Sequence, residues 1–174
     1  PHLQLLTAKP VLYVCNVEEN SASEGNTLSN KVVKMAIEQG AVSVVISAKI
    51  EEEIAALKDE ADKVEFLEEL GLKETGLTRV IRAGYELLHL ITFFTVGPKE
   101  ARAWTVRKNA KAPQAAGAIH TDFEKGFIKA ETIAYNDFIN CDGEQGAKEA
   151  GKMRQEGRDY QTQDGDIMLF RFNG

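Results

Sequence analysis

The sequence has 174 residues, of which 43% are apolar, so it is long enough for one ordinary domain or two small ones around hydrophobic cores. No apolar run approaches the roughly 18 residues of a membrane span and no signal segment opens the chain, so a cytoplasmic protein is expected. The net charge of −6 is carried by the first 87 residues, and the rest of the chain is neutral. Overall charge therefore gives no support for nucleic-acid binding, which would need a local basic patch.

The two cysteines, Cys15 and Cys141, lie far apart and have no Cys or His neighbour at metal-ligand spacing. We expect reduced thiols, with neither a disulfide framework nor a metal site. The sequence begins at Pro1 rather than Met. This start suggests a processed or truncated product of a longer protein.

The first half alternates apolar runs with amphipathic segments. In chain order it predicts a strand at 11–15, a helix at 28–39, a strand at 41–46 and helical segments at 50–70 and 77–88. The acidic run at 51–53 is interpreted as the partner of a helix N-terminal dipole. Strand, helix and strand form a βαβ unit, whose ligands lie at the carboxyl edge of the sheet, where Asn16 and Ser47 follow the two strands.

Beyond residue 88 the pattern favours strands over helices. Strands are predicted at 90–96, 103–106, 127–135 and 167–172, with short helices at 113–119 and 144–154. Periodicity alone supports an α+β unit here, whereas the first half is α/β.

A polar string, Asn16-Val17-Glu18-Glu19, follows the first predicted strand. Guanine-binding P-loop proteins carry Asn-Lys-x-Asp at such a strand end, where the Asp accepts the guanine N1 and amino protons. Val17 in place of Lys and Glu19 in place of Asp predict weakened selectivity for guanine. Taken alone, Asn-x-x-Glu after a strand is more often a helix-capping loop.

A second base-reading string, Ser47-Ala48-Lys49, is predicted at the end of the next strand. Its loop amides and lysine stem would meet the other edge of the base.

The surroundings of both strings resemble the YchF family, also called EngD, whose members are relatives of the Obg GTPases. The resemblance rests on the two strings, on Lys9-Pro10 and on the segments 76–85, 101–105, 112–128 and 143–152. It covers nearly the whole chain.

The resemblance implies a cytoplasmic ATPase or GTPase that uses ATP or GTP with Mg²⁺ and associates with ribosomes or RNA. It assigns residues 1–87 to the C-terminal portion of the nucleotide-binding G domain and residues 88–174 to a TGS domain, a ubiquitin-like β-grasp module. The residues expected to contact the purine base are Asn16, Val17, Glu19, Ser47, Ala48 and Lys49.

Phosphoryl transfer needs a Gly-x-x-x-x-Gly-Lys-Ser/Thr loop to hold the phosphates, and this sequence contains none. We therefore assign no catalytic residue, and we expect neither hydrolysis nor tight nucleotide binding by this chain alone.

Several other side chains have both a functional and a structural interpretation. The candidates for RNA or ribosome contact are Lys125, Lys129, Lys148, Lys152, Arg154 and Arg158. Their acidic neighbours make an ordinary solvated surface almost as plausible. His120 and Asp122 are interpreted as a local hydrogen-bonded cap rather than an acid–base pair. Trp104, Phe127 and Tyr135 fall in predicted strands, which favours core packing over base stacking.

Two hypotheses follow. In the first, the chain is the base-reading and ribosome-docking part of a nucleotide hydrolase. In the second, it is a stand-alone β-grasp interaction module whose α/β half is only a support.

Overall fold

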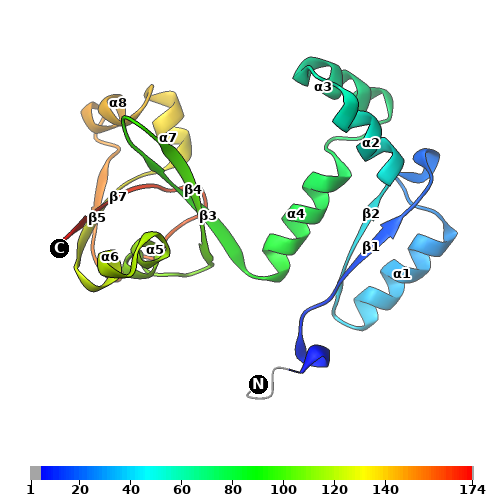
Figure 1. Ribbon diagram of the computed structural model, residues 1–174, viewed down its shortest axis with the longest axis horizontal. Helices are drawn as coiled ribbons and strands as arrows, with labels where there is room; N and C mark the ends of the chain where they lie inside the picture. Colours follow the sequence, from blue (N-terminus) through cyan, green and yellow to red (C-terminus); the bar gives the residue numbers. More distant parts are fainter. Residues whose placement is uncertain (1–4, 174) are drawn as a thin grey trace. The chain divides into compact units, whose positions relative to one another are not determined.

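The computed structural model describes residues 5–173. Its contacts divide the chain into two units, Pro1–Leu88 and His89–Gly174, here called unit 1 and unit 2. Figure 1 shows the elements of each unit along the chain.

Unit 1 is built on two parallel strands. Its elements are the 3-10 turn η1 (Leu6–Ala8), β1 (Leu12–Asn16), the 3-10 turn η2 (Glu19–Ser21), α1 (Thr27–Glu38), β2 (Val42–Ile46), α2 (Ala48–Ala56), α3 (Glu60–Glu69) and α4 (Gly76–Leu87). The strands pair from Leu12 opposite Val42 to Asn16 opposite Ile46. Helices α1 and α4 pack on this pair, on opposite sides in Figure 1. The predicted strand–helix–strand order is confirmed.

Residues next to each end of helix α1 determine where it begins and ends. The Asn26 side chain accepts the N–H groups of Leu28 and Ser29 at 3.0 and 2.9 Å, and the Ser29 hydroxyl accepts the Asn26 N–H at 2.8 Å. This reciprocal cap satisfies N–H groups that have no partner within the helix. Gly40, at a φ of 65°, follows the helix and turns the chain into β2.

The helical segment expected at 50–70 is two helices rather than one. Leu57 and Asp59 are extended, with ψ near 134° and 137°, so α2 ends at Ala56 and α3 begins at Glu60. The apolar spacing continues across the break, because Ile50, Ile54 and residues of α3 all pack on one cluster. The periodicity of apolar residues therefore does not reveal the break between α2 and α3.

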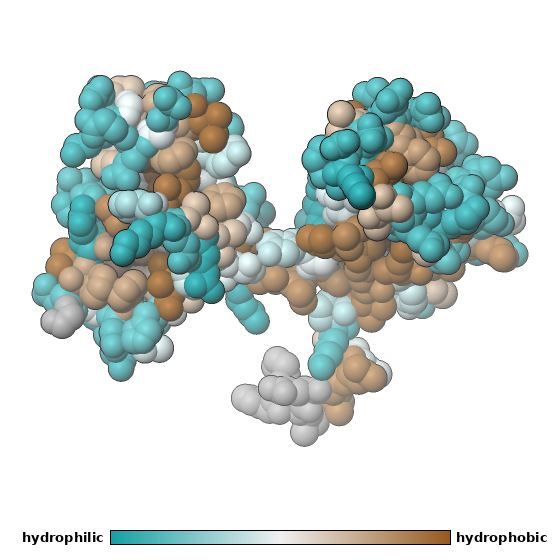
Figure 2. Space-filling view, turned by 45° about the horizontal axis from the view of Figure 1, so that its top comes forward, coloured by the Kyte–Doolittle hydropathy of each residue, from teal (hydrophilic) through white to brown (hydrophobic). Residues whose placement is uncertain are grey.

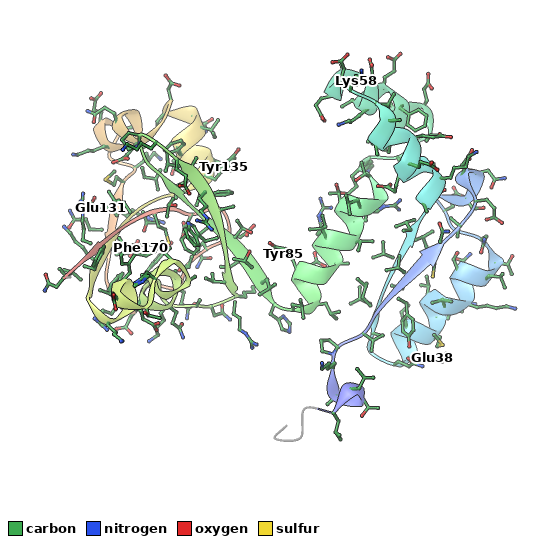
Figure 3. All side chains as sticks on the ribbon, viewed as in Figure 1. Glu38, Lys58, Tyr85, Glu131, Tyr135 and Phe170 are labelled. Atoms are coloured by element: carbon green, nitrogen blue, oxygen red, sulfur yellow. The ribbon has the colours of Figure 1, made fainter. Side chains whose placement is uncertain are left out.

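Unit 2 is a five-stranded mixed sheet with helices. Its elements are β3 (Leu90–Val96), β4 (Ala101–Arg107), α5 (Ala112–Ile119), α6 (Thr121–Lys125), β5 (Phe127–Ile133), α7 (Tyr135–Asn140), α8 (Glu144–Glu149), β6 (Arg154–Glu156) and β7 (Ile167–Phe172). The strand order is β4-β3-β7-β5-β6, with β3 and β7 parallel and the other pairs antiparallel. Phe93, Met168 and Phe170 pack against alanines of α5 in the core, and Figure 3 labels Phe170.

Two expectations for unit 2 are wrong. The helix expected at 144–154 ends at Glu149, because Gly151 at a φ of 69° turns the chain, and residues 154–156 form strand β6 on the sheet edge. The strand expected at 127–135 ends at Ile133. Tyr135 instead begins α7, is about half exposed and lies beside Phe94 with ring centroids 6.1 Å apart.

Two structural interpretations are confirmed. Trp104 lies in β4, packs on the core and donates its indole N–H to Thr95 at 2.9 Å, and Phe127 in β5 is buried. His120 is a cap, because its Nδ1 accepts the N–H of Asp122 at 3.2 Å and α6 begins at the next residue, Thr121.

Candidate functional site

The loops that follow β1 and β2 are joined at the carboxyl edge of the strand pair. The Val17 N–H donates to the Ile46 carbonyl at 2.8 Å, which extends the parallel ladder by one bond. One residue earlier, the Asn16 side-chain oxygen accepts the Ala48 N–H at 2.9 Å. The two strings singled out in the sequence, 31 residues apart at their first members, therefore meet in space because parallel strands end at the same edge.

A pocket of about 440 Å³ opens between these loops. Its lining consists of Asn16, Val17, Glu18, Glu19, Asn20, Ser47 and Lys49. Five of the six expected base-contacting residues are in this lining, and Ala48 takes part through the amide held by Asn16. Glu18 and Asn20 also line the pocket. In the sequence, the only indication of their participation is their position in the same loop as Asn16 and Glu19.

An ion pair crosses this pocket. The Lys49 ammonium group contacts the Glu19 carboxylate, and Glu53, one turn further along α2, lies 3.9 Å from the same nitrogen. Glu19, through its hydrogen bond and its charge, raises the pKa of Lys49. The side chain of Lys49 is 67% exposed and that of Glu19 is 41% exposed, so the pair orients the two side chains more than it stabilises the fold.

Glu18 connects the pocket to the start of α1. Its carboxylate accepts the Asn26 side-chain amide at 2.9 Å, and Asn26 is the residue that caps α1. A backbone hydrogen bond at Glu18, followed by the Asn26 amide, holds the pKa of this carboxyl below its usual value. The loop is thus fixed at both ends.

Ser47 carries a buried hydroxyl without a protein partner. The residue is 2% exposed, and within residues 5–173 no hydrogen bond to its Oγ is found. A buried hydroxyl that makes no hydrogen bond is unfavourable. Because Ser47 also lines the pocket, a polar atom of a bound molecule is a suitable partner for it.

Glu51 attaches the neighbouring helix α4 to this region. Its two carboxylate oxygens accept the N–H groups of Gly76 and Leu77 at 2.6 and 3.0 Å. The acidic run therefore supplies a helix dipole partner for α4, and Glu51 also lies in the first turn of its own helix α2. A Cβ on Gly76 would lie 2.9 Å from Glu51 and from Ile46, so this contact leaves no room for a side chain. Because Glu51 and Gly76 lie 25 residues apart, no spacing pattern in the sequence predicts this contact.

The six basic candidates of unit 2 do not form one unpaired patch. Lys129 lies 4.0 Å from Glu131, Lys152 lies 3.4 Å from Asp137, and Arg158 donates to the Phe127 carbonyl. In the part of the chain described, no ion pair is found for Lys125 or Lys148.

Arg154 belongs to a partly buried network instead. It donates to the Tyr160 hydroxyl at 3.1 Å and lies 3.6 Å from the Asp166 carboxylate. Asp166 is 2% exposed and accepts the Tyr160 hydroxyl at 2.7 Å and the Gln163 N–H at 2.8 Å. This network fixes the loop before β7.

Two absences within residues 5–173 bear on the class of site. No group of three or more His, Cys, Asp or Glu side chains is placed to hold a metal ion. Within the same residues, none of the helices has the length and hydrophobicity of a membrane span. Cys15 and Cys141 are free and partly buried.

Known proteins resemble the chain in sequence and in structure. The YchF-GTPase_C family profile, described as a protein of unknown function (DUF933), matches residues 90–173. The chain is 61% identical over 168 residues to the Haemophilus ducreyi protein "Ribosome-binding ATPase YchF", covering 97% of this chain and 46% of that protein. The Escherichia coli O157:H7 protein of the same name is 57% identical over 172 residues, covering 99% and 47%.

A solved structure agrees with these matches. The Schizosaccharomyces pombe YchF GTPase superimposes with a TM-score of 0.83 at 38% identity, over 98% of this chain and 45% of that one. The mixed α/β fold of the chain is thus that of a YchF structure. The chain spans about half the length of the curated relatives that it matches. On the sequence matches and the shared fold together, the chain belongs to the YchF family.

Proposed function

We infer that unit 1 reads the purine base in a ribosome-binding nucleotide hydrolase and that unit 2 contacts the ribosome or RNA. The observation that carries this proposal is the Asn16–Ala48 hydrogen bond, which closes the two strand-end loops around one pocket. Relatives bear the name "Ribosome-binding ATPase", which supports a nucleotide and a ribosome as ligands of the whole protein. A ribosomal partner would also place the protein in the cytoplasm.

The arrangement favours weak discrimination against adenine. The Asn16 oxygen is occupied by the Ala48 N–H, so the Asn16 amide hydrogens remain to donate to N7, which adenine and guanine share. The Ala48 N–H, being bonded within the protein, is not available to a guanine O6. Neither group distinguishes the two purines.

Glu19 and Ser47 supply the other contacts. A carboxylate only accepts hydrogen bonds, and an Asp at this position can accept both the N1–H and the amino group of guanine. The longer Glu19 disturbs this paired geometry but can still accept a single hydrogen bond from the exocyclic amino group of either purine. Lys49 must first release Glu19, because the two are paired across the pocket. The buried Ser47 hydroxyl adds a donor or acceptor at the pocket wall.

The strand order of unit 2 supports the β-grasp proposal. The central β3 and β7 are parallel, each is flanked by an antiparallel strand, and α5 packs on the sheet. A TGS domain has this ubiquitin-like arrangement. Lys125 and Lys148 remain the basic candidates for ribosomal or RNA contact, since four others are held by internal partners.

Hydrolysis requires residues beyond this chain, which has no phosphate-binding loop. ATP or GTP with Mg²⁺ therefore belongs to the whole protein in this proposal, and no residue here is assigned to the metal. Incubation of the purified chain with ATP or GTP should release no phosphate above background. Release that is lost in Glu19→Ala would contradict the assignment of unit 1 to base reading alone.

Base preference is tested in a chimera in which this chain replaces the C-terminal half of the Escherichia coli relative. We expect hydrolysis of ATP at least as efficient as that of GTP, with Glu19→Ala lowering kcat/KM for ATP. Asp137→Ala, in unit 2, is the matched control and should leave both rates unchanged. Strong selectivity for GTP would refute the account of Glu19.

Ribosome contact is tested by co-sedimentation of the same chimera in the nucleotide-free, ADP-bound and ATP-bound states. The proposal expects binding in at least one state, reduced by Lys125→Glu or Lys148→Glu. If no state binds, the alternative stands: unit 2 is an interaction module for another partner, with unit 1 as its support.

A further inference from the structure

A groove of about 420 Å³ lies along strand β2, away from the pocket described above. Its lining includes four consecutive residues of the strand, 42–45. Asn30 and Val33 of α1 line it from one side, and Arg79 and Ala83 of α4 from the other. Among the described residues β2 pairs only with β1, so the groove follows the unpaired edge of the strand.

The hydrogen bonds of the strand pair show which backbone groups face this groove. The Val42 N–H donates to the Val11 carbonyl at 3.1 Å, and the Ile46 carbonyl accepts the Val17 N–H at 2.8 Å. Residues 42, 44 and 46 therefore direct their backbone groups toward β1. Because consecutive residues alternate in a parallel ladder, Ser43 and Val45 direct their N–H and C=O groups toward the groove. The edge thus offers two donors and two acceptors.

The wall formed by α4 contains a donor that lacks an acceptor. The Nε atom of Arg79 is buried, and no partner for it is found within residues 5–173. Arg82, which also lines the groove, is already paired with Glu74 at 2.7 Å. All these α4 residues come from the segment 76–85, for which base reading provides no role.

We propose that this groove binds an extended peptide segment of another protein, which adds to β2 as a third strand. The segment hydrogen-bonds to Ser43 and Val45, and one acidic side chain accepts from Arg79. Glu24 and Glu86 also line the groove, so a strongly acidic segment is disfavoured. The fitting partner is nearly neutral, with alternating β-branched residues and a single acidic one. This inference does not depend on nucleotide binding.

The probe is a displayed library of random seven-residue peptides, selected on the 174-residue chain and followed by anisotropy titration of the enriched peptides. Ser43→Pro removes the outward N–H while leaving the bonds to β1, because proline is tolerated on an edge strand. We expect this variant to weaken binding by about tenfold or more, the effect of losing a well-placed hydrogen bond and the adjoining contacts. Ser43→Ala keeps the N–H and should bind within about twofold of the parent chain.

A second readout does not depend on any variant. Bound peptide should slow hydrogen exchange at the amides of Ser43 and Val45 and leave Ala48 unaffected. Arg79→Gln should weaken the binding of peptides that carry an acidic residue more than the binding of peptides that carry none. Circular dichroism verifies that each variant is folded.

Three results would overturn the proposal. They are the absence of enriched peptides, equal binding to folded Ser43→Pro, and unchanged exchange at Ser43 and Val45. Sedimentation velocity identifies a different occupant: a dimer of the chain that Ser43→Pro dissociates would assign the groove to a second copy instead.

Discussion

Asn16 holds two loops together with one side-chain oxygen. Because its bond to the Ala48 N–H lies in a partly solvated position, water replaces it at limited cost when it is removed. Asn16→Ala should therefore loosen the loop locally and speed hydrogen exchange of the Ala48 amide by about fivefold. Asn20→Ala is the control, since Asn20 lines the same pocket and, within residues 5–173, its side chain is found bonded only to the adjacent Ser21. Equal acceleration by both changes would mean that the Asn16 bond has no special role.

The protonation of Tyr160 makes the stability of unit 2 depend on pH in the alkaline range. Burial, and then the hydrogen bond to Asp166, raises the pKa of Tyr160 well above its ordinary value of 10.0. Above pH 10.0 the unfolded chain releases the phenolic proton while the folded chain retains it, so the folded state binds more protons. Stability therefore falls as the pH rises further.

Urea unfolding followed by Trp104 fluorescence, repeated across the alkaline range, measures this fall. Tyr160→Phe should flatten the pH dependence even though it lowers stability at neutral pH by removing the bond to Asp166. Tyr135→Phe changes a half-exposed tyrosine and is expected to keep the slope of the parent chain. A slope unchanged in Tyr160→Phe would assign the alkaline loss to other groups.

At the scale of elements, α2 and α4 are joined through a single carboxylate. Glu51→Ala removes both acceptors from the first turn of α4 and leaves the N–H of buried Gly76 without a partner. Unit 1 should lose about 1–3 kcal/mol of unfolding free energy, measured by urea denaturation with far-ultraviolet circular dichroism. Glu52→Ala, on the exposed side of the same helix, should cost far less. Similar losses from the two variants would contradict this role for Glu51.

Sequence patterns located the elements that are determined locally. The apolar runs before Asn16 and Ser47, together with the rule that parallel strands end at one edge, placed the pocket and most of its lining. The Asn26 cap and Gly40 fix the bounds of α1 through neighbouring residues alone. These features need no knowledge of distant contacts.

The elements that sequence patterns missed depend on partners far along the chain. Strand β6 has only three residues and no apolar alternation, and it forms because Arg154, Gln155 and Glu156 pair with β5. The Glu51–Gly76 contact spans two helices, and the Ser47 hydroxyl is isolated by burial rather than by sequence. Tyr135 fits a strand prediction because aromatic residues favour strands, whereas α7 begins at this residue.

At the scale of the whole molecule, each unit has its own core. The larger cluster includes Phe93, Phe127, Met168 and Phe170, all within unit 2, and the smaller one lies within unit 1 around Ile50 and Ile54. Residues 89–174 should therefore fold when expressed alone. Amide resonances of this fragment are expected to coincide with those of the same core residues in the full chain. A poorly dispersed spectrum would show that unit 2 depends on unit 1.

The ion pair between Lys49 and Glu19 gives the pocket an unusual response to ionic strength. Adenosine is uncharged, yet it must compete with Lys49 for Glu19, and dissolved ions weaken exposed charge pairs. Its affinity should therefore rise, by about twofold, as sodium chloride increases from about 50 to about 500 mM. Chemical-shift titration of unit 1 measures this change, and Lys49→Met should remove it. The pocket would therefore bind an uncharged base most tightly at high ionic strength, where the attraction between Lys49 and Glu19 is weakest.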